Sequence, residues 1–240
     1  MSGMGVGRSV ELLRAFRLEQ SAPDVFYGTL ARDTAAMIER LHPVAGCTVL
    51  DAGCGPRQFA ETFVRAGARY IGVDYDPEAL DPIDDPRAQA VAGDARSLPL
   101  ADASVDIAYS SNVFEHVVHP ERLGDELVRV TRPGGLIVVS YTNWLSPWGG
   151  HETSPFHYLG GQRAIDRYTR TYGRAPKNQV DVNLFRTSVA QGLRWARSQR
   201  DAQLIQAIPR YYPSWVSWMV RVPAVREVVT WNLWLALRRR

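Results

Sequence analysis

Three short apolar runs of this chain each end in an aspartate that could bind the polar groups of a ligand. The acids are Asp51, Asp74 and Asp94, and Gly53 and Gly55 follow the first of them. Because glycine has no Cβ, the backbone at such a turn can bend sharply and come into contact with a ligand. Carboxylates accept hydrogen bonds from hydroxyl and amino groups. The pattern therefore predicts a site for a nucleotide-like ligand.

The segments that carry these acids alternate in the manner of an α/β protein. Five strands are predicted by apolar runs near residues 47–51, 70–74, 88–93, 105–110 and 135–141. Helices are predicted at 9–20, 24–41, 162–173 and 186–197, and two final strands at 203–208 and 228–237. Ligands bind outside the carboxyl ends of the strands in an open parallel sheet, so the three acids are expected to face one crevice.

Five sequence blocks resemble, in order and spacing, class I S-adenosylmethionine-dependent methyltransferases, and within them the group that includes the ubiquinone and menaquinone methyltransferases. The resemblance covers residues 45–142. The blocks are Leu-Asp-Ala-Gly-Cys-Gly at 50–55, Gly-Val-Asp at 72–74, Gly-Asp-Ala at 93–95, Ser-Val-Asp-Ile at 104–107 leading to Asn-Val-Phe-Glu-His-Val at 112–117, and Leu-Val-Arg-Val-Thr-Arg-Pro-Gly-Gly at 127–135. The resemblance implies a Rossmann-like α/β fold, with a seven-stranded, mostly parallel sheet, an antiparallel last strand and helices on both faces.

By this resemblance the cofactor is S-adenosyl-L-methionine, and each acid binds a different part of it. Asp51 and the backbone of the glycine turn hold the methionine end. Asp74 accepts hydrogen bonds from both ribose hydroxyls, and Asp94 accepts one from the adenine amino group. The remaining cofactor-binding residues that the resemblance implies are Ala52, Gly53, Cys54, Gly55, Tyr75, Ala95 and Ser111, of which Ser111 would line the channel to the acceptor.

Other interpretations of the same residues stay open. Aspartates also cap turns and helices, and a dinucleotide site likewise needs a glycine turn followed by an acid. The dinucleotide fingerprint, however, has a glycine where Gln58 stands, and it leaves Gly93 and Asp94 unexplained. Arg57 replaces the third glycine of the methyltransferase turn, and its side chain points either to solvent or to the cofactor carboxylate. This departure leaves as an alternative a non-catalytic protein that keeps the cofactor fold and docks an anionic partner.

Histidines gather in the part of the chain that follows the fourth and fifth predicted strands. Methyl transfer to a hydroxyl requires in-line approach and removal of the acceptor proton, which a histidine or carboxylate can perform. We predict His151 or His157 as the general base, oriented by Glu152, with His116 as the third candidate. A divalent metal held by His151, Glu152 and His157 is an alternative. The predicted site contains no metal, since two ligands at this spacing in a loop have little specificity.

The residue types at the expected acceptor side narrow the acceptor. The one lysine, Lys177, lies far from the motif strands, so a two-lysine site for RNA ribose methylation is excluded. The sequence after the fourth strand, Ser110-Ser111-Asn112, differs from the Asn-Pro-Pro-Tyr type of nucleobase amino methyltransferases. We therefore predict O-methylation of a small molecule, a lipid or an envelope glycan, and nucleic acid is disfavoured. The loop and tail are also loosely similar to uncharacterised actinobacterial methyltransferases associated with cell-envelope glycans.

Charge is divided unequally along the 240 residues. Residues 1–157 hold 13 basic and 21 acidic side chains, whereas residues 158–240 hold 15 basic and 4 acidic ones. A basic C-terminal part suits an anionic partner, either a phosphate-bearing substrate or a membrane surface, although a solvated arginine-rich face has the same composition. The tail mixes aromatic residues with arginines, a composition that suits contact with anionic lipid but also occurs in an ordinary core. These residues are Tyr211, Tyr212, Trp215, Trp218, Trp231, Trp234, Arg210, Arg221, Arg226, Arg238, Arg239 and Arg240.

We expect one methyltransferase domain over residues 1–240. Its predicted parts are N-terminal helices (1–43), a cofactor-binding core (44–142), an acceptor-side loop with helices (143–200), and the last strands with the basic aromatic tail (201–240). The first residues are charged at intervals and lack the apolar core of a signal peptide. The expected location is cytoplasmic, with peripheral contact at the inner face of the membrane left open.

Overall fold

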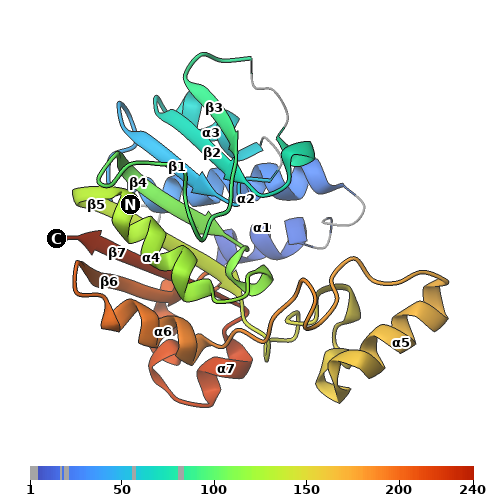
Figure 1. Ribbon diagram of the computed structural model, residues 1–240. Coiled ribbons are helices and arrows are strands. Elements are labelled where there is room, and N and C mark those ends of the chain that lie inside the picture. Colours follow the sequence, from blue (N-terminus) through green and yellow to red (C-terminus); the bar gives the residue numbers. More distant parts are fainter. Residues whose placement is uncertain (1–4, 17, 19–21, 56–57, 81–83) are drawn as a thin grey trace.

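A seven-stranded mixed sheet forms the centre of the computed structural model, which describes residues 5–16, 18, 22–55, 58–80 and 84–240 (Figure 1). The strands are β1 (Thr48–Ala52), β2 (Arg69–Asp74), β3 (Ala88–Ala92), β4 (Val105–Ser111), β5 (Thr131–Thr142), β6 (Ala202–Pro209) and β7 (Asn232–Arg239). Their order is β3-β2-β1-β4-β5-β7-β6. Strands β1 to β5 pair in parallel, and β7 pairs antiparallel with both β5 and β6. The predicted Rossmann-like sheet with an antiparallel last strand is confirmed.

Helices cover both faces of the sheet (Figure 1). One core cluster joins the sheet to α1 (Val6–Phe16), α2 (Pro23–Glu39) and α3 (Gln58–Arg65), and the other joins it to α4 (Pro120–Val130) and α6 (Val189–Ser198). Side chains of a strand alternate between its two faces. Val49 and Val138 accordingly pack in the first cluster, whereas Leu50 and Val139 pack in the second. Central strands that are apolar on both faces therefore require helices on both sides.

The last strand begins later than its sequence pattern predicts. Residues 228 and 229 belong to α7 (Val225–Val229), and β7 starts only at Asn232. The reason is a tertiary contact of Glu227, whose carboxylate oxygens accept hydrogen bonds from the backbone N–H groups of Val189 and Ala190. These donors open helix α6, where a carboxylate satisfies free N–H groups. The cap favours a helical turn at residues 225–229.

The segment between β5 and α6 carries little regular structure near the sheet. It contains the 3₁₀ turns η3 (His151–Thr153) and η4 (Phe156–Leu159), followed by α5 (Gly161–Tyr172). Helix α5 packs against these two turns and stands away from the sheet (Figure 1). The segment starts at the carboxyl end of β5, the same edge at which β1, β2 and β4 end. It therefore lies where a ligand of the sheet would bind.

The basic aromatic tail does not form one surface. Trp234 and Arg210 are both fully buried, so these two residues belong to the core. Trp215 and Trp218, on η5 (Ser214–Arg221), are 72% and 56% exposed and follow the carboxyl end of β6. The C-terminus lies at the opposite edge of the sheet (Figure 1), since β7 runs antiparallel to β6. Among the described residues, no helix has the length and apolar character that crossing a membrane requires.

Candidate functional site

The turn after β1 brings the backbone close to its neighbours. Gly53 has a φ of +80°, and a Cβ on it would collide with the side chain of Val113. Gly55 has a φ of +49°, and a Cβ there would meet no described atom within 4 Å, so this backbone borders open space. Only glycine adopts these conformations readily. Arg57, which replaces the family's third glycine, lies outside the described residues.

Asp51 is held beneath this turn by two tyrosines. The residue is 2% exposed, and its Oδ2 accepts hydrogen bonds from the hydroxyls of Tyr70, at 2.7 Å, and of Tyr109. Burial raises the pKa of Asp51 to about 7, although the hydrogen bonds from Tyr109 and Tyr70 oppose the rise. Both protonation states of this acid are therefore populated near neutral pH.

Asp74 links the glycine turn to the loop after β2. Its Oδ2 accepts a hydrogen bond from Gly55 N at 2.9 Å, and its Oδ1 accepts one from Asp76 N at 3.0 Å. An ionised carboxylate has about four acceptor sites, so further hydrogen bonds can form. Tyr75, next in the chain, is 80% exposed at the same strand end.

Asp94, after β3, is bound by an arginine that sequence reasoning missed. Arg96 Nη2 lies 2.7 Å from Asp94 Oδ2, and Arg96 N lies 2.8 Å from Asp94 Oδ1. These contacts lower the pKa of Asp94 and keep it ionised. The signal was the Asp94-Ala95-Arg96 spacing, which lets one residue contact the other across a tight turn. An adenine amino group would share this carboxylate with the guanidinium of Arg96.

Ser111 ends β4 beside a second arginine that sequence reasoning placed in the tail. The fully buried Arg210 donates from Nη1 to the hydroxyls of Ser111, at 3.0 Å, and Ser140, at 3.1 Å. Its Nη2 donates to Thr34 Oγ1 at 2.5 Å. A buried guanidinium needs such partners, because desolvation of an unpaired charge is costly. Arg210 thus connects α2 with the carboxyl ends of β4 and β5.

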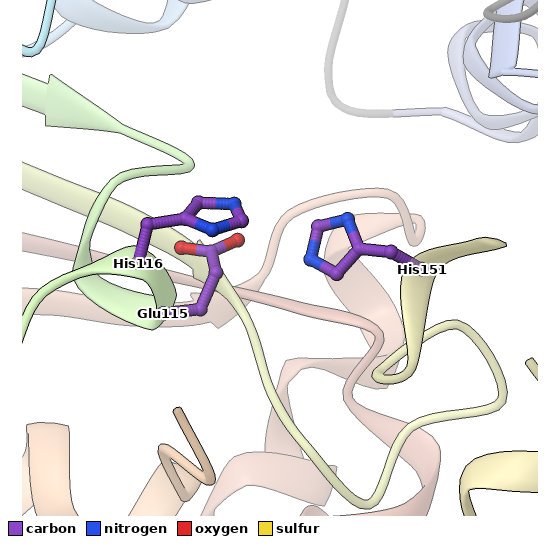
Figure 2. Close-up of side chains that lie close together, drawn as sticks. All are labelled: Glu115, His116 and His151. Atoms are coloured by element: carbon purple, nitrogen blue, oxygen red, sulfur yellow. The ribbon is translucent and has the colours of Figure 1, made fainter. Parts of the chain in front are cut away.

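Two histidines and a glutamate converge at the ends of β4 and β5 (Figure 2). Glu115 and His116 lie on η2 (Phe114–His116), and His151 lies on η3. The rings of His116 and His151 are 5.0 Å apart. One ligand atom of each residue lies within 4.8 Å of those of the other two, so this cluster, and not His151 with Glu152 and His157, is the described set with the geometry to hold a metal ion. The fold, rather than sequence spacing, assembles it.

The three members of this cluster have different surroundings. Glu115 is 1% exposed; its Oε1 accepts from Thr142 N at 2.9 Å, and its Oε2 has no hydrogen-bond partner among the described residues. His116 Nδ1 lies 2.6 Å from the carbonyl oxygen of Asn183. A carbonyl only accepts, so Nδ1 carries a proton, and in the neutral ring the lone pair is on Nε2. Burial lowers the pKa of His151 to about 3, and repulsion from the imidazoles of His116 and His157 contributes to this shift.

The other predicted catalytic residues serve the loop in which they lie. His157 is 1% exposed, with Nε2 3.1 Å from the carbonyl of Trp144 and Nδ1 3.4 Å from Ser154 Oγ. Glu152 Oε2 accepts from Asn178 Nδ2 at 3.0 Å. Glu152 and His157 lie close to His151 in the sequence, but in the structure their polar atoms bond to other partners. Glu115, which sequence reasoning did not select, stands directly before His116 in the block 112–117.

This chain is similar to known proteins in both sequence and fold. Residues 50–139 match the methyltransferase domain family. An uncharacterised methyltransferase of Mycobacteroides abscessus is 52% identical, covering 97% of this chain and 94% of its own length. An S-adenosylmethionine-dependent methyltransferase from Mesorhizobium loti superimposes with a TM-score of 0.59 at 22% identity, over 87% of this chain and 98% of that one. A structure from the complex of the Haloferax volcanii Trm112 methyltransferase activator with a methyltransferase gives a TM-score of 0.58 at 17% identity, over 96% of both chains.

Proposed function

The chain belongs to the S-adenosylmethionine-dependent methyltransferases, and from this premise we propose that it methylates a hydroxyl oxygen of a small molecule, a lipid or an envelope glycan. The observation that carries the proposal is the set of residues gathered at the carboxyl ends of the parallel strands. Asp51 and Asp74 lie at the carboxyl ends of β1 and β2, and Asp94 follows β3, whereas His116 and His151 follow β4 and β5. Cofactor groups and proton-accepting groups thus stand side by side along those ends.

The residues at the strand ends fit the cofactor. S-adenosylmethionine supplies a methyl group on a positively charged sulfur. In our proposal Asp51 and the backbone from Ala52 to Gly55, including Cys54, bind its methionine end. Asp74 binds the ribose hydroxyls beside Tyr75, Asp94 and the Ala95 backbone bind the adenine, and Ser111 marks the passage to the acceptor. The open space beside Gly55 supports this arrangement, because the cofactor needs close contact with the turn.

His116 is our choice for the proton acceptor. Its Nδ1–H is fixed by the carbonyl of Asn183, so in the neutral ring Nε2 has the free lone pair that can accept a proton. With the cofactor bound, this Nε2 would take the hydroxyl proton while the oxygen gains the methyl group and the bond between that carbon and the sulfur breaks. His151 remains neutral at physiological pH because of its low pKa, and it is suited to position the acceptor oxygen by a hydrogen bond. Glu115 stabilises the imidazolium that forms at His116.

Cofactor affinity should depend on the ionisation of Asp51. Only the carboxylate attracts the cofactor ammonium, and the pKa of Asp51 is about 7. Affinity is therefore reduced below that pH and rises as the pH increases from about 6 to 8, by up to tenfold per unit at the acidic end. Calorimetry of S-adenosylmethionine binding measures this. The Asp51→Asn variant is the control, since the cofactor's own amino group titrates equally with both proteins. Parallel pH profiles for the two proteins would remove Asp51 from the binding of the ammonium.

Contact with an anionic membrane is the second part of the proposal, and it concerns η5. Trp215 and Trp218 are exposed, and Arg221 ends the same turn η5, which follows the carboxyl end of β6. Exposed tryptophans together with an arginine are suited to a lipid interface. The terminal Arg238 instead donates to the carbonyls of Leu41 and Gly134 at the far edge. Trp215→Ala with Trp218→Ala should lower flotation with anionic liposomes severalfold at low salt, whereas Arg238→Gln should not. Equal flotation of all three proteins would dismiss η5 as the contact.

The acceptor can be sought directly. The purified protein is incubated with cell-envelope extracts and methyl-labelled S-adenosylmethionine, and the products are separated and weighed by mass spectrometry. The proposal predicts labelled lipid or glycan species that are missing when His116→Ala replaces the wild type. Label only in nucleic acid would overturn the proposed acceptor class.

A further inference from the structure

An apolar cavity of about 180 Å³ lies beside the histidine cluster, between α1 and the segments that follow β5 and β6. We call it the aromatic cavity. Its walls include Leu13, Phe16, Trp148, Tyr212 and Trp231. The ring of Trp148 is 5.1 Å from Phe16 and 6.0 Å from Trp231, and Tyr212 is 5.4 Å from Trp231. Aromatic rings thus surround the cavity on several sides.

Two connections join this cavity to the cluster. Thr142 lines the cavity, and its backbone N–H donates to Glu115 Oε1 at 2.9 Å. Trp148 lines it as well, and the carbonyl of Trp148 accepts from His151 N at 2.9 Å. The cavity and the cluster are therefore neighbours, joined through the backbone of Thr142 and of Trp148. The cofactor carboxylates lie elsewhere, at the ends of β1, β2 and β3, beyond β4 in the strand order.

We propose that the aromatic cavity binds a compact apolar group of the methyl acceptor, about the size of one aromatic ring, with the acceptor hydroxyl directed at Glu115, His116 and His151. This inference rests on the proposed function and names its substrate class: an amphiphile whose hydroxyl stands beside a ring. A cavity of about 150 Å³ lined by apolar side chains is large enough to bind benzene. A volume near 180 Å³ therefore fits one ring with a small substituent.

The chemistry of the walls favours a ring over a sugar. A sugar would need hydrogen-bond partners for each hydroxyl, and the residues named on the walls are mostly apolar. Ser9 contributes a hydroxyl that is buried without a partner among the described residues. Burial raises the pKa of Tyr212 to about 12, as expected beside apolar surroundings. Aromatic groups gain from offset or edge-to-face contact with rings such as these.

The test uses 4-fluorobenzyl alcohol as the probe, observed by ¹⁹F NMR with the full-length protein. Leu13→Trp fills the cavity and should weaken probe binding at least tenfold. Glu11→Trp is the matched control: it places the same side chain at an exposed position of α1 and should keep the affinity within twofold. Ser9→Leu is a second filling variant, for use if Leu13→Trp fails to fold. Unlabelled benzyl alcohol should displace the probe, and glucose should not.

Three outcomes would overturn the proposal: no probe binding by the wild type, equal affinity of the filled and control variants, or 1-octanol binding at least tenfold tighter than benzyl alcohol, which would assign the cavity to an alkyl chain. Calorimetry with S-adenosylmethionine distinguishes failure of this cavity proposal from failure of the proposed function. A protein that binds the cofactor and methylates an acceptor, but ignores the probe, loses only the aromatic acceptor.

Discussion

A His116→Ala variant should transfer methyl groups about 100-fold more slowly than the wild type, with S-adenosylmethionine affinity nearly unchanged. The expected loss is that of a general base, whose contribution is about 10²-fold or more. His116 fits the role because the carbonyl of Asn183 fixes its Nδ1–H and leaves Nε2 free to take a proton. Single-turnover rates on the identified acceptor, measured together with calorimetric cofactor affinity, check the prediction.

His119→Ala provides the matched control. His119 lies three residues further along the chain, is exposed, and contacts Glu121 at 3.1 Å rather than the cluster, so its loss should leave turnover unchanged. His151→Ala should slow turnover by a smaller factor, since we propose that this residue only positions the acceptor. A larger loss with His151→Ala than with His116→Ala would exchange the two roles. Normal turnover in both variants would place the base elsewhere.

Replacing Asp74 by alanine should weaken S-adenosylmethionine binding at least tenfold. In our proposal the change removes two charge-assisted hydrogen bonds to the ribose, each worth roughly 1.5 to 3 kcal/mol, whereas a tenfold change corresponds to only about 1.4 kcal/mol. It also removes the acceptor of Gly55 N, which holds the glycine turn. Titration calorimetry with the cofactor gives the affinity directly.

Asp76→Ala separates the ribose contact from a general loss of loop structure. Asp76 is exposed and accepts from Glu78 N at 2.9 Å, so its replacement should disturb the same loop while leaving the affinity within about threefold. Identical cofactor affinity in Asp74→Ala and the wild type would contradict the ribose role and reopen the dinucleotide interpretation.

The sequence allowed the fold and the placement of the acids at strand ends to be predicted, because both depend on local pattern. Apolar runs that end in Asp51 and Asp74 place each acid at a strand end, and parallel pairing then brings those ends together. The start of β7 was predicted too early, since the contact of Glu227 with α6 is not local. Apolar periodicity does not contain such information.

The acceptor side could be predicted only in part, because loop side chains are directed by tertiary contacts. His151 and His157 stand six residues apart and looked equivalent, yet His157 bonds the carbonyl of Trp144 while His151 meets His116. Arg210 belongs to a segment whose composition suits a surface tail, but its side chain is buried among hydroxyls. The ubiquinone-type grouping and the link to envelope glycans stay predictions.

The central claim, methyl transfer to oxygen at the cluster of Glu115, His116 and His151, is tested most directly by locating the transferred carbon. The wild-type protein is given S-adenosylmethionine with a ¹³C-labelled methyl group and the acceptor found in the extract screen, and the product is analysed by ¹³C NMR. We predict a single methoxy signal that is formed about 100-fold more slowly by His116→Ala. A methyl signal on nitrogen, carbon or sulfur, or a methoxy signal formed equally fast by His116→Ala, would contradict the account.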